Sequence, residues 1–312
     1  MAAIFTAIFS LLSRKRPKFI ALGSLYVDTL RILERWPNNF NLIETSFIRE
    51  DFTKLLEKTI NENISGVIIE VPSNPLIELA DFEKLIEISH SKGAKVIIDN
   101  TIATPINFNP FNLGADIIVH STSKILNGKN NHIGGALLSN SEDIIENIKK
   151  FNELTKLDMN VFDMRTLLRN LKKFKPRMEI INENSKAIAN FLNHHHSVKK
   201  VFHPSLENNP NHLLMKKYLK GGSGLLSFIL RDPSAEIAGK FYDHIQKPIL
   251  KGPSLGSEKT LLSPYVMMAH YEDSKEDLKK WGLEFYLMRL SVGIEPVEEI
   301  IACLRSALNL LK

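Results

Sequence analysis

The stretch that decides the fold is residues 95–135, KVIIDNTIATPINFNPFNLGADIIVHSTSKILNGKNNHIGG. It contains two short apolar runs, residues 96–98 and 117–119, and each run ends in polar residues. Short runs of uninterrupted apolar residues are typical of parallel strands that are covered on both faces. The sequence therefore predicts an α/β fold whose ligands bind at the carboxyl ends of these strands.

Charged and hydroxyl side chains follow these two strands. Asp99 comes directly after the first run, and Lys124 follows the second run together with Ser121 and Ser123. This set of groups suits pyridoxal 5′-phosphate (PLP), because a carboxylate pairs with the pyridine nitrogen, a lysine forms a Schiff base with the aldehyde, and hydroxyls bond the phosphate. From these residues alone, charged side chains that merely face solvent at the edge of a sheet remain an alternative.

Motifs along the whole chain narrow these alternatives. They are EVPSNP (70–75), IIDNTIATP (97–105), GADIIVHSTSKILNG (114–128), GG (134–135), LLRNLK (167–172), GLLSF (224–228), PSLGS (253–257) and MRLSVGIE (288–295). Their order resembles the Cys/Met metabolism family of PLP-dependent enzymes, which includes cystathionine γ-synthase, the cystathionine lyases, methionine γ-lyase and the O-acylhomoserine sulfhydrylases. The resemblance implies the fold of the fold-type-I PLP-dependent transferases, which is similar to that of aspartate aminotransferase.

Domain organisation follows from length and pattern. A chain of 312 residues is long enough for two domains. We expect a large, mostly parallel PLP-binding domain at 1–175, without its N-terminal part, and a smaller α/β domain at 176–312. The patterns predict helices at 1–12, 51–61, 81–91 and 295–311, strands at 18–22, 66–70, 224–230, 249–251 and 284–292, and several helices within 141–178. Residues 167–172 resemble a family signature of the long helix that joins the domains.

Composition excludes several other classes of protein. The formal net charge of +5 comes from scattered residues, with no basic run longer than residues 14–16, so we expect no nucleic-acid partner. The apolar residues 1–12 are too few to span a membrane, and the basic run follows them instead of preceding them as in a signal peptide. The single cysteine, Cys303, excludes an intrachain disulfide and fits a reducing cytoplasm. Residues 194–196 are three consecutive histidines at the end of an expected helix, where they point in different directions, so we expect no metal site.

The resemblance also implies further site residues. Tyr26 corresponds to a tyrosine that stacks on the cofactor ring and assists the leaving group, and Asn74 to an asparagine that bonds the phenolic oxygen. Arg289 corresponds to the arginine that binds the substrate α-carboxylate, for which a planar guanidinium is suited. Ser254 corresponds to a serine near the substrate.

The first residues match only the end of a family motif. Met1-Ala2-Ala3 corresponds to the last three residues of Ser-Gly-Met-Ala-Ala, in which backbone amides at a helix N-terminus face the phosphate, so Met1 is a candidate cofactor-binding residue. A Tyr-x-Arg pair, which in the family clamps the phosphate from a neighbouring subunit, does not occur in this sequence. We therefore expect either a misplaced gene start or a truncated relative with impaired cofactor binding.

These observations predict a PLP-dependent lyase or transferase of transsulfuration and methionine biosynthesis, with elimination or replacement on a small sulfur-related amino acid. Pro253, just before Ser254, stands where members that handle cystathionine often have glutamate, which disfavours cystathionine. Two departures lie near the site: Val27-Asp28 replaces small residues, and Lys129 and Asn131 replace a histidine and an aspartate. The resemblance implies a homo-oligomer, either a dimer or a tetramer. A non-catalytic or partner-dependent homologue and, less favoured, a fold-type-I aminotransferase are the alternatives.

Overall fold

The computed structural model describes residues 1–35, 40–43 and 52–311, and the chain divides into two compact units. The first unit comprises Met1–Asn74, Leu79–Ser123 and Asn131–Arg169. The second comprises Pro75–Glu78, Lys124–Asn130 and Asn170–Lys312. The chain thus passes from one unit to the other between Ser123 and Lys124, within the motif that carries the candidate lysine. The division into domains at residue 175 stays a prediction.

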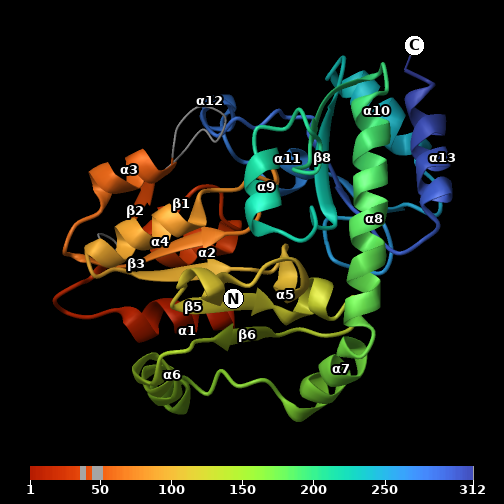
Figure 1. Ribbon diagram of the computed structural model, residues 1–312. Helices are drawn as coiled ribbons and strands as arrows, with labels where there is room; N and C mark the ends of the chain where they lie inside the picture. Colours follow the sequence, from red (N-terminus) through yellow and green to blue (C-terminus); the bar gives the residue numbers. More distant parts are fainter. Residues whose placement is uncertain (36–39, 44–51, 312) are drawn as a thin grey trace. The chain divides into compact units, whose positions relative to one another are not determined.

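The first unit is built on a six-stranded sheet in the order β2-β1-β3-β4-β5-β6 (Figure 1). The first five strands pair in parallel, and β6 is antiparallel to β5. The strands are β1 Lys18–Leu22, β2 Phe40–Ile43, β3 Ile64–Glu70, β4 Lys95–Asp99, β5 Ile117–Ser121 and β6 Gly135–Leu138. The predicted strands at 18–22, 66–70, 96–98 and 117–119 are confirmed.

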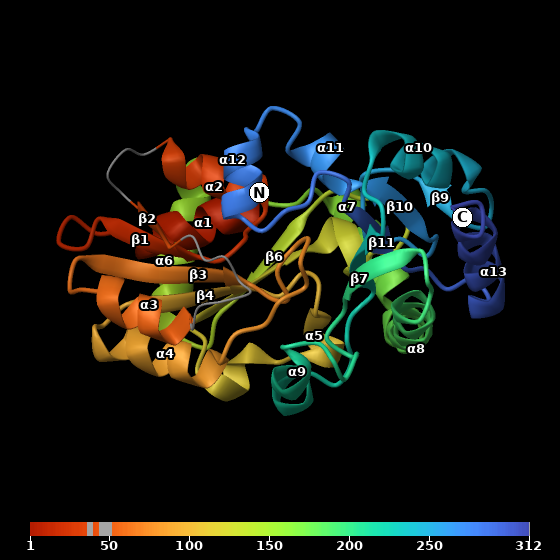
Figure 2. The same ribbon diagram turned by 90° about the horizontal axis from the view of Figure 1, so that it is seen from above.

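Helices cover both faces of this sheet, with α3 and α4 on one side and α1 and α6 on the other (Figures 1 and 2). The α-helices of this unit are α1 Ala2–Leu11, α2 Val27–Glu34, α3 Phe52–Thr59, α4 Phe82–Ser91, α5 Thr104–Asn107 and α6 Glu142–Thr155. Shorter turns are the 3₁₀ turn η1 Pro110–Leu113 and the π-type turn η2 Thr122–Leu126. Because both faces are covered, all seven residues of β3 are buried, which explains its unbroken apolar sequence.

Strand register places the polar residues of this unit at one edge. Glu70 at the end of β3 pairs with Asp99 at the end of β4, and Asp99 in turn lies beside Val119 of β5. The carboxyl ends of these three neighbouring strands therefore lie together. This is the edge at which parallel α/β sheets bind their ligands.

The second unit has a five-stranded sheet in the order β7-β8-β11-β10-β9, antiparallel except for β10 with β9. Its strands are β7 Val198–Phe202, β8 Leu225–Leu230, β9 Leu250–Lys251, β10 Leu261–Pro264 and β11 Met288–Ser291. Its helices are α8 Phe174–Asn193, α9 His212–Tyr218, α10 Ala235–His244, α11 Tyr265–Ala269, α12 Lys275–Lys280 and α13 Val297–Leu308. Buried side chains of α8, α10 and α13 form one core with those of the sheet.

Two sequence-based boundaries were wrong. The motif at 167–172 does not lie in the long helix but at the end of α7, Val161–Leu171, which is separate from the 20-residue α8. Pro176 lies in the first turn of α8, where a proline is tolerated, whereas inside one continuous helix it would kink or break the helix. The strand expected at 284–292 is limited to β11, because Leu287 N donates to Glu284 O at 2.9 Å and forms a turn before it.

Two structural features of the described residues bear on the class of protein. Among the described helices, none combines the length and the apolar character that crossing a lipid bilayer requires. The described residues also contain no group of three or more histidine, cysteine, aspartate or glutamate side chains that could hold a metal ion. His194 follows α8 directly as its C-cap, so the three histidines lie at a helix end as expected.

Candidate active site

Asp99 is a buried carboxylate at the end of β4, with 8% of its surface exposed. Its Oδ1 accepts hydrogen bonds from Thr101 N at 3.0 Å and from Thr101 Oγ1 at 2.5 Å. Burial raises the pKa of Asp99, and the two hydrogen bonds from Thr101 only partly oppose this effect. Within the described residues Asp99 forms no ion pair, so its carboxylate is available to pair with a cationic group.

Thr101 joins Asp99 to the neighbouring strand. The same hydroxyl that donates to Asp99 accepts a hydrogen bond from Ser121 N at 2.8 Å. The structure therefore brings two predicted residues, Asp99 and Ser121, together through a residue that sequence reasoning missed. A hydroxyl residue two positions after a strand-end carboxylate was the available signal, since such residues commonly bond back to the backbone and side chains near them.

Ser123 and Thr122 are held by the segment that leads into β6. Ser123 Oγ accepts from Gly134 N at 2.9 Å, and Thr122 Oγ1 lies 2.8 Å from Nε2 of His132. The other ring nitrogen of His132 lies 3.2 Å from Oδ1 of Asp163, which is in the first turn of α7. This chain of contacts fixes the two residues directly before Lys124, and it involves His132 and Asp163 rather than the substituted positions Lys129 and Asn131.

The N-terminus of α1 lies against the start of β6. Met1 is the N-cap of α1 and is partly exposed. A Cβ at Gly135 would come 2.8 Å from the Cβ of Ala3, so only glycine allows this close approach of helix and strand. Because β6 pairs with β5 and Gly135 faces Ser121 in register, the orphan amides of the α1 N-terminus lie on the side of the sheet where β5 ends.

Tyr26 and Asn74 lie after two other strands of the same sheet. Tyr26 follows β1 and precedes α2, and its N donates to Glu70 Oε2 at 2.8 Å. Its side chain is 44% exposed, and burial, a hydrogen bond to Asp28 and the charge of Asp28 raise the pKa of Tyr26. Asn74, four residues after the end of β3, is buried.

Lys124, Ser254 and Arg289 form a cluster within the second unit. Lys124 Nζ donates to Ser254 Oγ at 3.2 Å. Arg289 Nη2 donates to Pro253 O at 2.5 Å and to Ser254 O at 3.3 Å, and its guanidinium lies 4.4 Å from the centre of the Tyr265 ring. Burial lowers the pKa of Lys124, and the positive charge of Arg289 lowers it further. Three residues that the sequence singled out separately therefore meet here.

The residues around Asp99 and those around Lys124 have the chemistry that PLP requires. A buried carboxylate without an ion pair among the described residues suits the protonated nitrogen of a pyridine ring, because the opposite charge offsets the burial of the carboxylate. A lysine whose pKa is lowered is more often a neutral amine, which is the form that attacks an aldehyde. The hydroxyls of Ser121 and Ser123 and the N-terminus of α1 are groups that bind phosphate.

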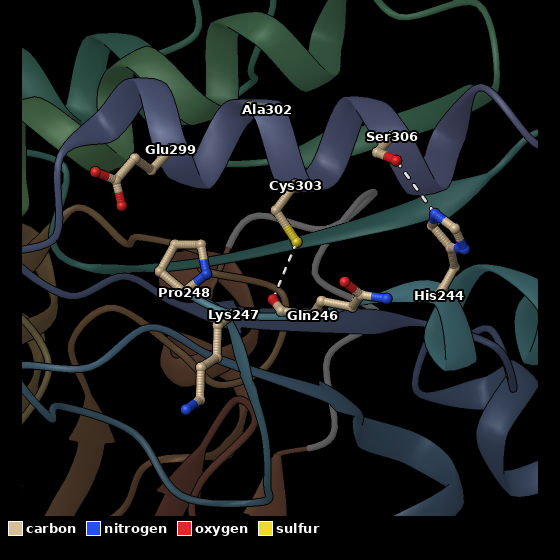
Figure 3. A pocket seen from close by; sticks show the side chains of 8 residues that line it. All are labelled: His244, Gln246, Lys247, Pro248, Glu299, Ala302, Cys303 and Ser306. Atoms are coloured by element: carbon tan, nitrogen blue, oxygen red, sulfur yellow. Dashed lines mark hydrogen bonds between the residues drawn. The ribbon is translucent and has the colours of Figure 1, made fainter.

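A separate pocket of about 310 Å³ lies in the second unit, between α13 and the segment that follows α10 (Figure 3). Cys303 points from α13 toward this segment and contacts Gln246 O at 3.1 Å, and His244 Nε2 lies 3.1 Å from Ser306 Oγ (Figure 3). None of its lining residues is a candidate site residue. The residues that line it are His244, Gln246, Lys247, Pro248, Glu299, Ala302, Cys303 and Ser306.

Comparison with known proteins establishes the family of this chain. A family model described as Cys/Met metabolism PLP-dependent enzyme matches residues 1–309. The chain belongs to this family. This Cys/Met metabolism enzyme therefore depends on PLP, and it is a lyase or transferase of transsulfuration type.

Individual relatives agree with this assignment. The enzyme is 33% identical over 307 residues to a cystathionine gamma-lyase of Dictyostelium discoideum, covering 98% of this chain and 78% of that protein. It is 32% identical over 312 residues to an L-methionine gamma-lyase of Fusobacterium nucleatum subsp. polymorphum, covering 99% of this chain and 78% of that protein. Cystathionine gamma-synthase of Xanthomonas oryzae pv. oryzae superposes with a TM-score of 0.91 and 28% identity, covering 99% of this chain and 79% of the other. The fold-type-I architecture expected from the sequence is confirmed.

Proposed function

We propose that this enzyme catalyses an elimination or a replacement at the β or γ carbon of a sulfur-related amino acid, with Lys124 as the group that moves the substrate proton. The observation that carries the proposal is the cluster in which the Lys124 amine bonds Ser254 beside Arg289. Its lowered pKa favours the neutral amine, which can attach to an aldehyde and accept a proton.

Each candidate residue then has a role in holding the cofactor. Lys124 binds the aldehyde, and the Asp99 carboxylate pairs with the ring nitrogen. The phosphate is bound by the hydroxyls of Ser121 and Ser123 and by the amides that follow Met1 at the start of α1. The remaining cofactor contacts are those of Asn74 with the phenolic oxygen and of the Tyr26 ring with the pyridine ring. These roles are supported by the positions of Asp99, Ser121 and α1 at one edge of the sheet.

Bound PLP supplies an electron sink that stabilises negative charge on the substrate Cα. With the substrate amino group bound to the aldehyde in its place, the released Lys124 amine would take the proton from Cα, and Asp99 would keep the ring nitrogen protonated. Arg289 orients the substrate through its α-carboxylate, for which its planar guanidinium is suited. Tyr26, whose pKa is raised, stays protonated and donates its proton to the leaving group.

Pro253 favours a substrate without a second amino group. Its carbonyl accepts from Arg289, while its ring has no charge with which to bind a distal ammonium group. A methionine-like or O-acylhomoserine substrate therefore fits this position better than cystathionine. Measurements of kcat/KM for methionine, O-acetylhomoserine and cystathionine on one preparation test this preference.

The enzyme acts as a homo-oligomer in the cytoplasm. Support for the oligomer comes from large apolar side chains that are exposed along the end of α6 and on α7, with Leu154 84%, Phe162 81% and Leu168 66% exposed. Large exposed apolar side chains of this kind are typical of protein–protein interfaces. Light scattering should give the mass of a dimer or a tetramer, and Phe162→Asp should reduce it. A reducing compartment is supported by the single cysteine, which is free.

The central experiment uses the purified full chain mixed with PLP. Wild-type protein should develop a visible absorbance band that borohydride removes, and the reduced adduct should map to Lys124. Lys124→Ala should show neither the band nor turnover, whereas Lys149→Ala, which changes an exposed lysine of α6, should behave like the wild type. A colourless wild-type protein in the presence of excess PLP would instead support the non-catalytic homologue.

A further inference from the structure

Arg177 of α8 is a buried cation that bonds the backbone immediately after Lys124. The residue is 3% exposed, and its Nη2 donates to Ile125 O and to Leu126 O, both at 2.9 Å. All four residues belong to the second unit. The guanidinium therefore holds the carbonyl groups of the two residues that follow the candidate lysine.

Glu258 balances the charge of this guanidinium. Its Oε1 lies 3.5 Å from Arg177 Nη1, and its Oε2 lies 2.7 Å from Lys129 Nζ. Burial lowers the pKa of Arg177, and the charge of Glu258 opposes this effect. The backbone takes part as well, because Glu258 N donates to Gly128 O at 2.8 Å. The carboxylate thus pairs with the guanidinium and with Lys129, which ends the turn that the guanidinium bonds.

Gly128 shows how tightly this turn is closed. It has φ of +70°, and a Cβ at this position would lie 2.6 Å from both Cζ and Nε of Arg177. The backbone therefore passes directly against the guanidinium, and no other residue type fits there without displacing it. Lys124 itself interrupts the helical turn η2, with φ of −95° and ψ of −126°. Its conformation is not imposed by regular secondary structure, so the bonds from Arg177 to the two following carbonyls help to fix the backbone from which its side chain extends.

We infer that Arg177 is a positioning residue for Lys124: by binding the Ile125 and Leu126 carbonyls it fixes the backbone from which the reactive amine extends. This inference rests on the proposed function of Lys124. A displacement of a reacting group by about 1 Å lowers the rate on the order of 100-fold, so loss of this anchor should slow the chemistry far more than substrate binding.

The test compares three variants of the full chain. Arg177→Met removes both carbonyl bonds, whereas Arg177→Lys keeps a cation with several N–H donors. Arg231→Met is the matched control, because Arg231 also donates to two backbone carbonyls of the second unit, those of His196 and Val198, outside the Lys124 segment. The readouts are the rate at which apoprotein and PLP form the visible band, kcat and KM measured separately, and the melting temperature of the apoprotein.

Arg177→Met should slow band formation and lower kcat by about tenfold or more while KM changes by less than about threefold, the split expected of a misplaced reactive group. Arg177→Lys should recover most of both rates, and Arg231→Met should keep wild-type rates. Wild-type rates in Arg177→Met, with only a lower melting temperature, would overturn the inference.

A second variant keeps the test decisive if Arg177→Met does not fold. Gly128→Ala leaves Arg177 in place but pushes a methyl group into its guanidinium, and it should slow both rates in the same way. Wild-type rates in Gly128→Ala would also overturn the inference. Lys124→Ala distinguishes failure of the proposed function from failure of the Arg177 inference. If this variant still forms a borohydride-sensitive band, the proposed function is wrong. If only the Arg177 inference is wrong, Lys124→Ala forms no band.

Discussion

Gly256 lies against the peptide bond that joins Lys124 to Ile125. A Cβ at Gly256 would lie 2.5 Å from Ile125 N and 2.9 Å from the carbonyl carbon of Lys124. Gly256 has φ of +81°, and its N donates to Ser291 Oγ at 2.8 Å. The PSLGS and MRLSVGIE motifs therefore meet at the backbone of the candidate lysine, and the glycine is what allows them to approach.

Gly256→Ala should displace this backbone, because the clashing atoms belong to main chain and cannot rotate away. We expect kcat to fall about tenfold or more, and overpacking together with the positive φ to destabilise the protein by about 1–3 kcal/mol.

Gly239→Ala in α10 is the control, since a Cβ there meets nothing within 4 Å. That change should stabilise the protein by about 0.5–1 kcal/mol and leave kcat unchanged. Steady-state kinetics and chemical denaturation measure both effects, and an unaltered kcat in Gly256→Ala would contradict the expectation.

Asp28 should control the alkaline limb of the activity profile through Tyr26. Burial and Asp28 raise the pKa of Tyr26, while the nearby charge of Arg31 lowers it. Asp28→Asn should therefore move the alkaline limb of kcat to lower pH, and Arg31→Ala should move it to higher pH. Both shifts should be modest and should shrink at high salt, because Asp28 and Arg31 form an exposed ion pair. Profiles of kcat from pH 7 to 11, with Tyr26→Phe as reference, provide the measurement; shifts of the same sign in both variants would exclude this electrostatic origin.

The sequence predicted best the elements whose patterns are local. Strands β4 and β5 are unbroken apolar runs followed by polar residues, so periodicity identifies them without any partner. Strands β6 and β10 were missed because each has only four residues, and their extended conformation depends on pairing with β5 and β11. Short edge and connecting strands of this kind carry little periodic signal of their own.

The residues of the candidate site also differ in how far the sequence alone reveals them. Asp99, Lys124 and Arg289 have distinctive chemistry inside recognisable motifs, and their identity is visible in the sequence. Thr101 was missed because its importance lies in two hydrogen bonds to different strands. Arg177 was missed because 52 residues separate it from Ile125, and no local pattern reports such a contact.

Asp99→Asn should stabilise the apoprotein at neutral pH while it weakens cofactor binding. Burial raises the pKa of Asp99 in the folded chain above its ordinary value of 3.8. The folded state then binds the proton more tightly than the unfolded state, so the free energy of unfolding falls as pH rises from 3.8 through the folded pKa. Removing the charge removes this loss, and the amide oxygen can still accept from Thr101.

Thermal unfolding of the two apoproteins between pH 3 and 8 checks this expectation. The melting temperature of Asp99→Asn should exceed that of the wild type at pH 7, and the difference should vanish near pH 3. Adding PLP should reverse the order, because only the carboxylate can pair with a cationic ring nitrogen. A variant that is less stable than the wild type at pH 7 and equal at pH 3 would show that Asp99 is stabilising as an anion, contrary to the sign derived above.

Arg289→Lys should weaken substrate binding and little else. Arg289 is already fixed by its bonds to Pro253 O and Ser254 O and by the face of the Tyr265 ring, which leaves a planar group oriented for a carboxylate. Lysine keeps the charge but loses the paired N–H donors, and charge-assisted hydrogen bonds are worth about 1.5–3 kcal/mol, so KM should rise roughly 10- to 100-fold.

Arg305→Lys is the matched control, because Arg305 also stacks on an aromatic ring, that of Phe191, on the exposed side of α13. Kinetics with an amino-acid substrate and with its amide should separate the effects: the rise in KM should appear for the carboxylate substrate and be absent for the amide, and an equal rise for both would mean that Arg289 does not bind the carboxylate.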